Sequence, residues 1–174
     1  MDQPLSSRQI KNELPGVPIH IYADLNRFIT LEQVLGSRGA AVLLYPGESD
    51  TNGHWVTLFK NKNDKGKPII EFFDPYGTSI DQEFQYTPIK HPHYLARLMV
   101  NSPYDIEYNE YRMQKMEPNI STCGKHVINR LKNRHLTLKQ YAHMFKGEPG
   151  GVTADQIVQE VYRDGYFNKG LDFF

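Results

Sequence analysis

Apolar runs in the middle of the chain, each ended by turn-forming residues, constrain the fold most strongly. Residues 40–45 form a short apolar run ended by a Pro-Gly pair, as expected for a buried strand. Residues 54–60 and 68–73 are β-branched and aromatic, and a polar loop containing Gly66 joins them. We therefore predict a hairpin within a compact mid-chain sheet, with residues 105–109 as a weaker strand.

Short helices are predicted on either side of these strands. Four Ser/Thr-x-x-Gln patterns precede periodic apolar stretches, and in each the hydroxyl accepts from an early helical N–H while the glutamine reaches back to the cap residue. The patterns begin at Ser6, Thr30, Thr137 and Thr153. The helices that they predict cover residues 7–14, 31–35, 138–145 and 154–162, and helical spacing predicts another over 93–100. Helices flanking a mid-chain mixed β-sheet indicate an α+β fold.

The length of 174 residues corresponds to one domain. We expect a main domain over residues 1–147 and an acidic helical C-terminal tail over 148–174, packed on the same domain. No apolar run approaches the ~18–20 residues of a membrane span, and the N-terminus lacks the apolar core of a signal peptide. Cys123 is the single cysteine, which excludes a disulfide-rich secreted scaffold.

The overall charge is balanced, with 20 Lys+Arg and 20 Asp+Glu, which predicts no strong general attraction to nucleic acid or membrane. The balance is uneven along the chain, because no acidic residue lies between Pro118 and Gly147. That stretch contains six basic side chains: Lys125, Arg130, Lys132, Arg134, Lys139 and Lys146. Two interpretations stay open, a solvated helix face and a contact surface for nucleic acid or an acidic partner.

Cys123 is the leading candidate nucleophile. Val127, Ile128 and Leu131 lie on one helical stripe, so a helix is predicted to begin at or just after Thr122. A cysteine in the first turn of a helix faces unpaired N–H groups and the positive end of the macrodipole, and both favour the thiolate. The alternative is an inert buried cysteine.

His54 is the best candidate base among the histidines. It begins a strand, and a hairpin can bring it beside Asp74 in the next turn, where a carboxylate would fix the imidazole tautomer and stabilise its charged form. His126 ranks second, because three residues after Cys123 it would point back along the helix rather than lie opposite the thiol. One cysteine and scattered histidines match no recognised metal-ligand spacing.

The order and spacing of three motifs resemble one group of proteases. The motifs are Gly53-His54-Trp55, Phe73-Asp74-Pro75-Tyr76-Gly77, and Pro118-Asn119 followed by Cys123-Gly124. They resemble those of adenain-type cysteine proteases, which process adenovirus precursors, and of the related ubiquitin-like-protein-specific (SUMO) proteases. The resemblance covers roughly residues 6–131 and implies the fold of that group, with a protease domain over residues 1–147.

The resemblance also implies a role for each motif residue. Cys123 is expected to be the nucleophile, His54 the general base and later acid, and Asp74 the orienting carboxylate, with Trp55 near the site. Glu71 is the alternative acid, but its odd spacing from Asp74 sends it to the opposite face of the strand.

The expected oxyanion donor departs from the family pattern. These families carry a glutamine next to, or one residue before, the Pro-Asn pair, whereas Glu117 precedes Pro118 in this chain and its ionised side chain can only accept hydrogen bonds. The nearest glutamine is Gln114. We expect either Gln114 or the backbone N–H groups of Cys123 and Gly124 to stabilise the oxyanion.

The expected function is therefore a monomeric cysteine endopeptidase that cleaves viral structural precursors after Gly-Gly-like sequences, in the virion and in the host cytoplasm or nucleus. It requires no cofactor; the acid-free stretch leaves nucleic acid open as an activator, and the absence of a second cysteine removes the disulfide-linked peptide that activates adenain. The alternatives are a protease that removes ubiquitin-like modifiers and an inactive binding module on the same fold. Residues 149–152, Pro-Gly-Gly-Val, are either a self-cleavage site at Gly151 or a glycine-rich loop.

Overall fold

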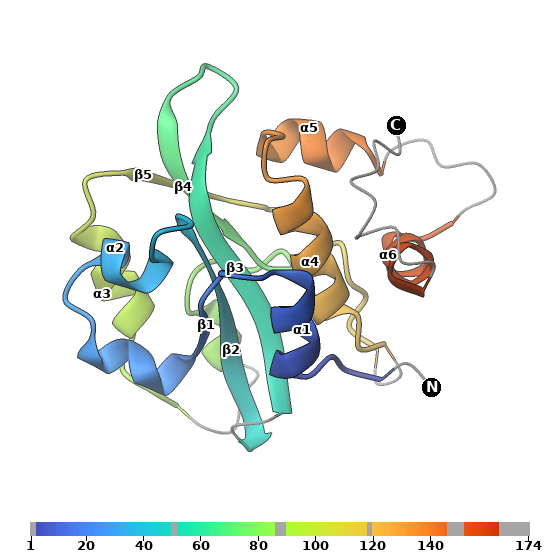
Figure 1. Ribbon diagram of the computed structural model, residues 1–174, viewed down its shortest axis with the longest axis horizontal. Coiled ribbons are helices and arrows are strands. Elements are labelled where there is room, and N and C mark those ends of the chain that lie inside the picture. The colour runs from blue at the N-terminus through green and yellow to red at the C-terminus, as the bar shows by residue number, and fades with distance from the viewer. Residues whose placement is uncertain (1–2, 50–51, 86–89, 118–119, 146–151, 164–174) are drawn as a thin grey trace.

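The computed structural model describes residues 3–49, 52–85, 90–117, 120–145 and 152–163. A five-stranded sheet forms its centre, with the strands in the order β1-β2-β3-β4-β5 (Figure 1). The strands are β1 (Ile19–Ile21), β2 (Ala40–Ser49), β3 (Asn52–Lys62), β4 (Pro68–Phe73) and β5 (Asp105–Tyr108). The α-helices are α1 (Ser7–Glu13), α2 (Leu31–Leu35), α3 (Tyr94–Val100), α4 (Cys123–Lys132), α5 (Leu138–His143) and α6 (Ala154–Arg163), and the 3-10 helices are η1 (Tyr22–Arg27) and η2 (Gln82–Gln85).

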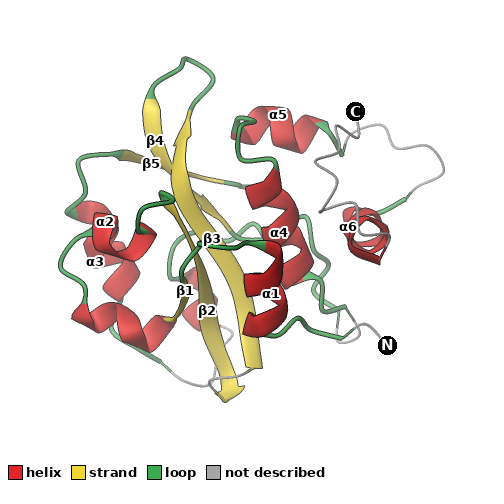
Figure 2. Cartoon of the chain, viewed as in Figure 1, coloured by secondary structure: helices red, strands yellow, loops and turns green. Residues whose placement is uncertain are grey.

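The sheet is mixed, and its topology explains why the helices form two layers. β1 pairs parallel with β2 and β4 pairs parallel with β5, while β3 is antiparallel to both of its neighbours. The two crossover connections therefore run in the same direction across the sheet, and with the usual right-handed sense they lie on the same face. α2 and α3 cover that face, and α1 and α4 cover the other (Figure 2).

Each face of the sheet has its own apolar core. Alternate residues of β2 and β3 point to opposite sides, as in any strand. Leu43 and Leu58 pack with η1, α2 and α3 in one cluster. Val42 and Phe59 pack with α1 and α4 in the other.

The four capping patterns are confirmed as helix starts. Ser6, Thr30 and Thr137 form capping boxes at α1, α2 and α5. At α6, Thr153 N–H donates to Gln156 Oε1 and Gln156 N–H donates to Thr153 Oγ1.

Two features of the sheet differ from the sequence prediction. β2 does not end at Pro46 but continues to Ser49, because Pro46 sits at a register shift where it lies opposite Gly53. An irregularity of this kind lets a strand carry proline without a lost ladder bond. β1 was not predicted, since three residues are too short to show a period.

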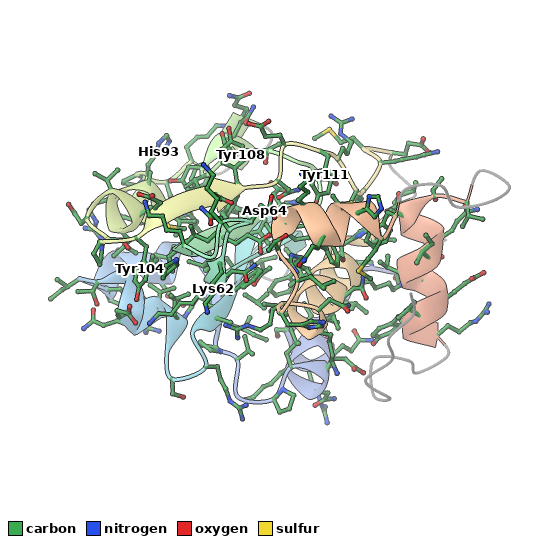
Figure 3. The ribbon with its side chains drawn as sticks, turned by 90° about the horizontal axis from the view of Figure 1, so that it is seen from above. Lys62, Asp64, His93, Tyr104, Tyr108 and Tyr111 are labelled. Carbon is green, nitrogen blue, oxygen red and sulfur yellow. The ribbon has the colours of Figure 1, made fainter. Side chains whose placement is uncertain are left out.

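The C-terminal part of the described chain packs on the second face. Ile157 and Val161 of α6 contact the cluster that contains Val127 and Leu131 of α4. Two hydrogen bonds hold the N-terminal end of α5: Thr137 Oγ1 donates to Asp64 Oδ1 at 2.7 Å, and Tyr111 Oη donates to the carbonyl of Leu138 at 3.4 Å (Figure 3). Across the described ranges, no helix is long and apolar enough to cross a membrane.

Candidate active site

The short length of β4 places Asp74 beside His54. β3 pairs with β4 only from Thr57 to Lys62, so the first residues of β3 have no β4 neighbour. The turn that follows β4 occupies this position, and His54 Nε2 lies 2.6 Å from Asp74 Oδ1. The side chains of His54 and Asp74 are 8% and 0% exposed, so water does not screen this pair.

Several hydrogen bonds hold the Asp74 carboxylate in a single orientation. The Tyr76 N–H donates to Oδ1 at 2.8 Å, closing a turn over the aspartate, and the Thr78 hydroxyl donates to Oδ2. Asn109 brackets the backbone of Asp74: its Oδ1 accepts from the Asp74 N–H, and its Nδ2 donates to the Asp74 carbonyl. The carboxylate therefore presents a fixed lone pair to the imidazole.

Tyr76 fixes the plane of the imidazole. Its ring stacks on His54 with ring centroids 4.2 Å apart and an interplanar angle of 9°. Asp74 and Tyr76 thus constrain His54 in two perpendicular directions, one along the ring plane and one across it. Because Nε2 faces Asp74, Nδ1 is the ring nitrogen left for a thiol.

Cys123 completes the set from the opposite layer. It is the first residue of α4, it is 5% exposed, and its side chain is hydrogen-bonded to His54. Leu5 packs closely beside the next residue, Gly124, where an added Cβ would lie 3.1 Å from the Leu5 side chain. Trp55 Nε1 donates to the Leu5 carbonyl at 2.9 Å, which ties the segment before α1 to the strand that carries His54.

The electrostatics favour a protonated imidazole. Burial alone would lower the pKa of His54, but the charge of Asp74, its hydrogen bond and the hydrogen bond to Cys123 together raise that pKa well above its ordinary value. An imidazolium beside a thiol stabilises the thiolate. The three side chains named by the sequence motifs therefore meet in one buried cluster.

Glu71 lies outside this cluster. Its carboxylate is fully buried and forms a bidentate ion pair with Arg130, at 2.7 Å from Nη2 to Oε2 and 3.1 Å from Nη2 to Oε1. Asn61 Nδ2 also donates to it at 3.4 Å. This arrangement agrees with the parity argument that separates Glu71 from Asp74, and it gives Glu71 a structural role.

Gln114, and not Glu117, is buried next to the cluster. Gln114 is 1% exposed, whereas Glu117 is exposed. Gln114 Nε2 donates to the Ile120 carbonyl at 3.2 Å and makes a long contact of 3.4 Å to Tyr76 Oη. Its Oε1 has no hydrogen-bond partner among the described residues. The amide group therefore lies between the tyrosine that stacks on His54 and the segment that leads to Cys123.

His126 belongs to a different pair. It is fully buried, and its Nε2 lies 2.9 Å from Asp155 Oδ1 on α6. Burial lowers the pKa of His126 more than the opposing hydrogen bond to Asp155 raises it. Its position thus differs from that of a base facing the thiol, and a second His–Asp pair lies beside the first.

Most of the basic stretch is engaged within the chain. The Arg130 guanidinium is buried against Glu71, and Arg134 donates to the carbonyls of Arg38, Gly39 and Lys60. The Lys125 ammonium lies 5.6 Å from the centre of the Tyr162 ring, and the Lys132 ammonium lies 3.7 Å from Glu13. Lys139 is exposed, and Lys146 lies outside the described residues, as does Gly151. The side chains that suggested a polyanion surface therefore mainly stabilise the fold.

A cavity of about 730 Å³ is lined by residues of α1 and of the sheet. Trp55, which follows His54, lines it together with Leu44 and Ile19 of the sheet. Arg8 and Lys11 of α1 and Asp24 of η1 also line it. Its volume is within the usual range for ligand sites, roughly 300–1,000 Å³. The described residues contain no group of three or more His, Cys, Asp or Glu that could hold a metal ion.

Sequence reasoning missed the residues that orient the cluster. The Asp-Pro-Tyr-Gly turn carried a usable signal, because an aspartate that opens a turn commonly accepts from the N–H two residues on. Nothing in the sequence distinguishes Asn109 or Asp155, whose partners are 35 and 29 residues away.

No family model matches the sequence. The sequence is 34% identical over 130 residues to the uncharacterized protein V9 of Sputnik virophage, an alignment that covers 71% of each chain. The chain belongs to the family of this virophage protein.

A solved structure, that of the Rickettsia bellii effector protein RickCE, also matches at 20% sequence identity with a TM-score of 0.34. The match covers 76% of this chain and 48% of that one, so the chain spans about half the length of the effector structure.

Proposed function

We propose that this protein is a cysteine endopeptidase that uses Cys123, His54 and Asp74. The observation that carries the proposal is the buried cluster in which Asp74 Oδ1 lies 2.6 Å from His54 Nε2 and the Cys123 side chain is hydrogen-bonded to His54. A nucleophile, a base in reach of it and a third group that orients the base are the arrangement that covalent acyl transfer requires.

The chemistry would proceed in two acyl-transfer steps. The Cys123 thiol gives its proton to His54, and the sulfur attacks the carbonyl carbon of the scissile peptide bond. The protonated His54 then donates that proton to the leaving amine as the C–N bond breaks, leaving a thioester on Cys123. Water, deprotonated by His54, attacks the thioester, and the thiol and a carboxylic acid are released.

The negative charge on the tetrahedral intermediate needs donors near the sulfur. The first N–H groups of a helix have no intrahelical acceptor, and those of Cys123 and Gly124 are in the first turn of α4. The side-chain amide of Gln114, whose Nε2 donates to the Ile120 carbonyl shortly before Cys123, is the further candidate donor. We propose that these groups form the oxyanion hole, with Gln114 exchanging its weak contact to Tyr76 for the substrate oxygen.

The proposed substrates are viral structural precursors, processed in the virion or the infected cell. The virophage source of the relative supports this choice. We further propose that the cavity lined by Trp55 holds part of the peptide substrate. Nucleic acid is not part of the proposal, because most of the basic stretch is engaged within the chain.

Alkylation of Cys123 by iodoacetamide, followed by mass spectrometry at several pH values, tests the mechanism. We expect alkylation at pH 6–7 to be at least about tenfold faster than that of a free cysteine, whose pKa is near 8.5. His54→Ala should abolish this difference, and Asp74→Asn should reduce it. Reactivity equal to that of a free thiol and insensitive to His54→Ala would instead identify an inactive binding module.

The substrate class is decided separately. Peptides that span Gly-Gly junctions of capsid precursors should be cleaved, and the cleavage should proceed through a thioester on Cys123. Rapid capture of a ubiquitin-like aldehyde probe, with no cleavage of the capsid peptides, would identify a protease for ubiquitin-like modifiers.

A further inference from the structure

The buried carboxylate of Asp155 connects two segments on either side of the candidate oxyanion hole. Asp155 is in the first turn of α6 and is 3% exposed. Its Oδ2 accepts from the Lys115 N–H at 3.0 Å, directly after Gln114. Its Oδ1 accepts from the Thr122 hydroxyl, directly before Cys123, and from His126 Nε2 at 2.9 Å. One side chain therefore fixes the backbone on both sides of the site.

The hydrogen bond from the Thr122 hydroxyl to Asp155 takes the place of a helix-capping hydrogen bond. Ser6, Thr30 and Thr137 each cap their own helix through the side-chain oxygen. Thr122 is the N-cap residue of α4 but makes no side-chain capping bond, because its hydroxyl points to Asp155. Thr122 therefore provides no side-chain acceptor to the N–H groups in the first turn of α4.

Burial favours the neutral form of His126, the second partner of Oδ1. Burial lowers the pKa of His126, while hydrogen bonds from His126, Thr122 and Lys115 outweigh burial and hold the pKa of Asp155 below its ordinary value. A neutral imidazole that donates from Nε2 has a lone pair on Nδ1, and that buried atom has no partner among the described residues. With His126 in this neutral form, the His126–Asp155 pair adds no positive charge that would repel the imidazolium of His54.

We propose that Asp155 is a positioning residue that holds Gln114 and the first turn of α4 in register, so that both can donate to the same oxyanion. The inference rests on the proposed function and deepens it. Asp155 touches neither the thiol nor His54 in any described contact, so it acts on the intermediate and not on the nucleophile.

Two reactions of Cys123 separate these roles. Alkylation by iodoacetamide displaces iodide from carbon and forms no oxyanion, so it reports only the thiolate. Acylation by p-nitrophenyl acetate passes through a tetrahedral oxyanion and releases p-nitrophenolate, so it reports the thiolate and the oxyanion hole together. The ratio of the two rates isolates the oxyanion contribution without an identified peptide substrate.

We expect Asp155→Asn to lower the acylation rate about tenfold or more while alkylation changes by less than about threefold. Gln114→Ala should have the same signature, and the double variant should be little worse than Gln114→Ala alone, because both changes disable one unit. If Asp155→Asn does not fold, Thr122→Val, which removes one of the three contacts, is expected to lower the ratio by about threefold or more.

Val158→Ala is the matched control, because Val158 is a buried residue of the same helix that makes none of these hydrogen bonds. It should lower stability but leave the ratio unchanged. An unchanged ratio in Asp155→Asn, additive effects in the double variant, or an equal loss in Val158→Ala would overturn the inference while leaving the proposed function intact. Absence of any His54-dependent reactivity in the wild-type protein would overturn both.

Discussion

Replacement of Arg130 by methionine tests the assignment of Glu71 to the fold. Arg130 and Glu71 are both 0% exposed at their side chains. The guanidinium also donates to the carbonyls of Asn133 and Leu136 at 2.8 and 2.9 Å. It lies 5.0 Å from the centre of the Phe59 ring and 4.6 Å from that of Tyr141. Methionine can keep part of the packing but none of the hydrogen bonds.

The expected loss follows from what remains after the substitution. Glu71 would be left as a buried carboxylate with only the 3.4 Å contact from Asn61, and the carbonyls of Asn133 and Leu136 would each lose a donor. Breaking a buried ion pair by removing one partner costs about 3–5 kcal/mol. Since a domain of this kind has about 5–15 kcal/mol of total stability, Arg130→Met should be among the most damaging single changes. Glu71→Gln added to Arg130→Met should recover part of the loss by removing the unpaired charge.

Urea unfolding followed by tryptophan fluorescence measures these differences, because Trp55 is the single tryptophan and is 4% exposed. Glu32→Gln is the matched control, since it breaks the ion pair between Glu32 and Lys60, whose side chains are 53% and 39% exposed. That change should cost less than about 1 kcal/mol. A loss below about 1 kcal/mol in Arg130→Met would refute the reasoning. So would a Glu71→Gln variant that is as unreactive toward iodoacetamide as Asp74→Asn.

Three further predictions concern the site and its pH dependence. Tyr76→Leu should slow Cys123 alkylation by about two- to tenfold, because the stacked ring contributes about 0.5–1.5 kcal/mol. Tyr76→Phe keeps the ring and should react like the wild type. Equal alkylation rates in the wild type and both variants would show that the stacking is irrelevant. Gly53→Ala should destabilise the chain and slow alkylation of Cys123, because the new Cβ would lie 1.9 Å from the Tyr45 carbonyl oxygen. A Cβ at Gly66 meets nothing within 4 Å, so Gly66→Ala should leave the alkylation rate unchanged. The two variants should therefore differ in alkylation rate. Burial lowers the pKa of His126 in the folded protein. As the pH falls below about 6.5, the unfolded chain therefore binds a proton at this histidine that the folded protein does not bind. The free energy of unfolding should then decrease by up to about 1.4 kcal/mol per pH unit, until the pH reaches the folded-state pKa of His126. The raised pKa of His54 leaves it protonated in both states in the lower part of this window, so urea titrations of His126→Gln should show a shallower pH slope than those of the wild type, and identical slopes would contradict the assignment.

The elements whose signals are local were predictable from the sequence. The helix starts at Ser6, Thr30, Thr137 and Thr153 were visible because a capping box lies within four residues. The parity of positions along a strand separated Glu71 from Asp74, because the side-chain period of two is a property of the backbone.

Other features depend on distant partners and could not be read from the sequence. A charge count treats Arg130 and Arg134 as free cations. Arg130 is instead buried against a glutamate of β4, and the half-buried Arg134 donates to carbonyls before β2 and in β3. The role of Asp155 is similar: a carboxylate in the first turn of a helix is common for reasons of the helix dipole alone. Its contacts to residues 115, 122 and 126 exist only after α6 has docked.

Because α6 follows Cys123 in the sequence, the parts of the site are synthesised one after another. His54, Asp74 and Cys123 leave the ribosome before Asp155, which follows Cys123 by 32 residues. At a synthesis rate of ~5–20 residues per second, this separation corresponds to about 2–6 seconds. During that interval a nascent chain can already contain the reactive thiol, while the carboxylate that anchors its helix has yet to be made. The protein would then reach its full hydrolytic activity only after α6 has been synthesised.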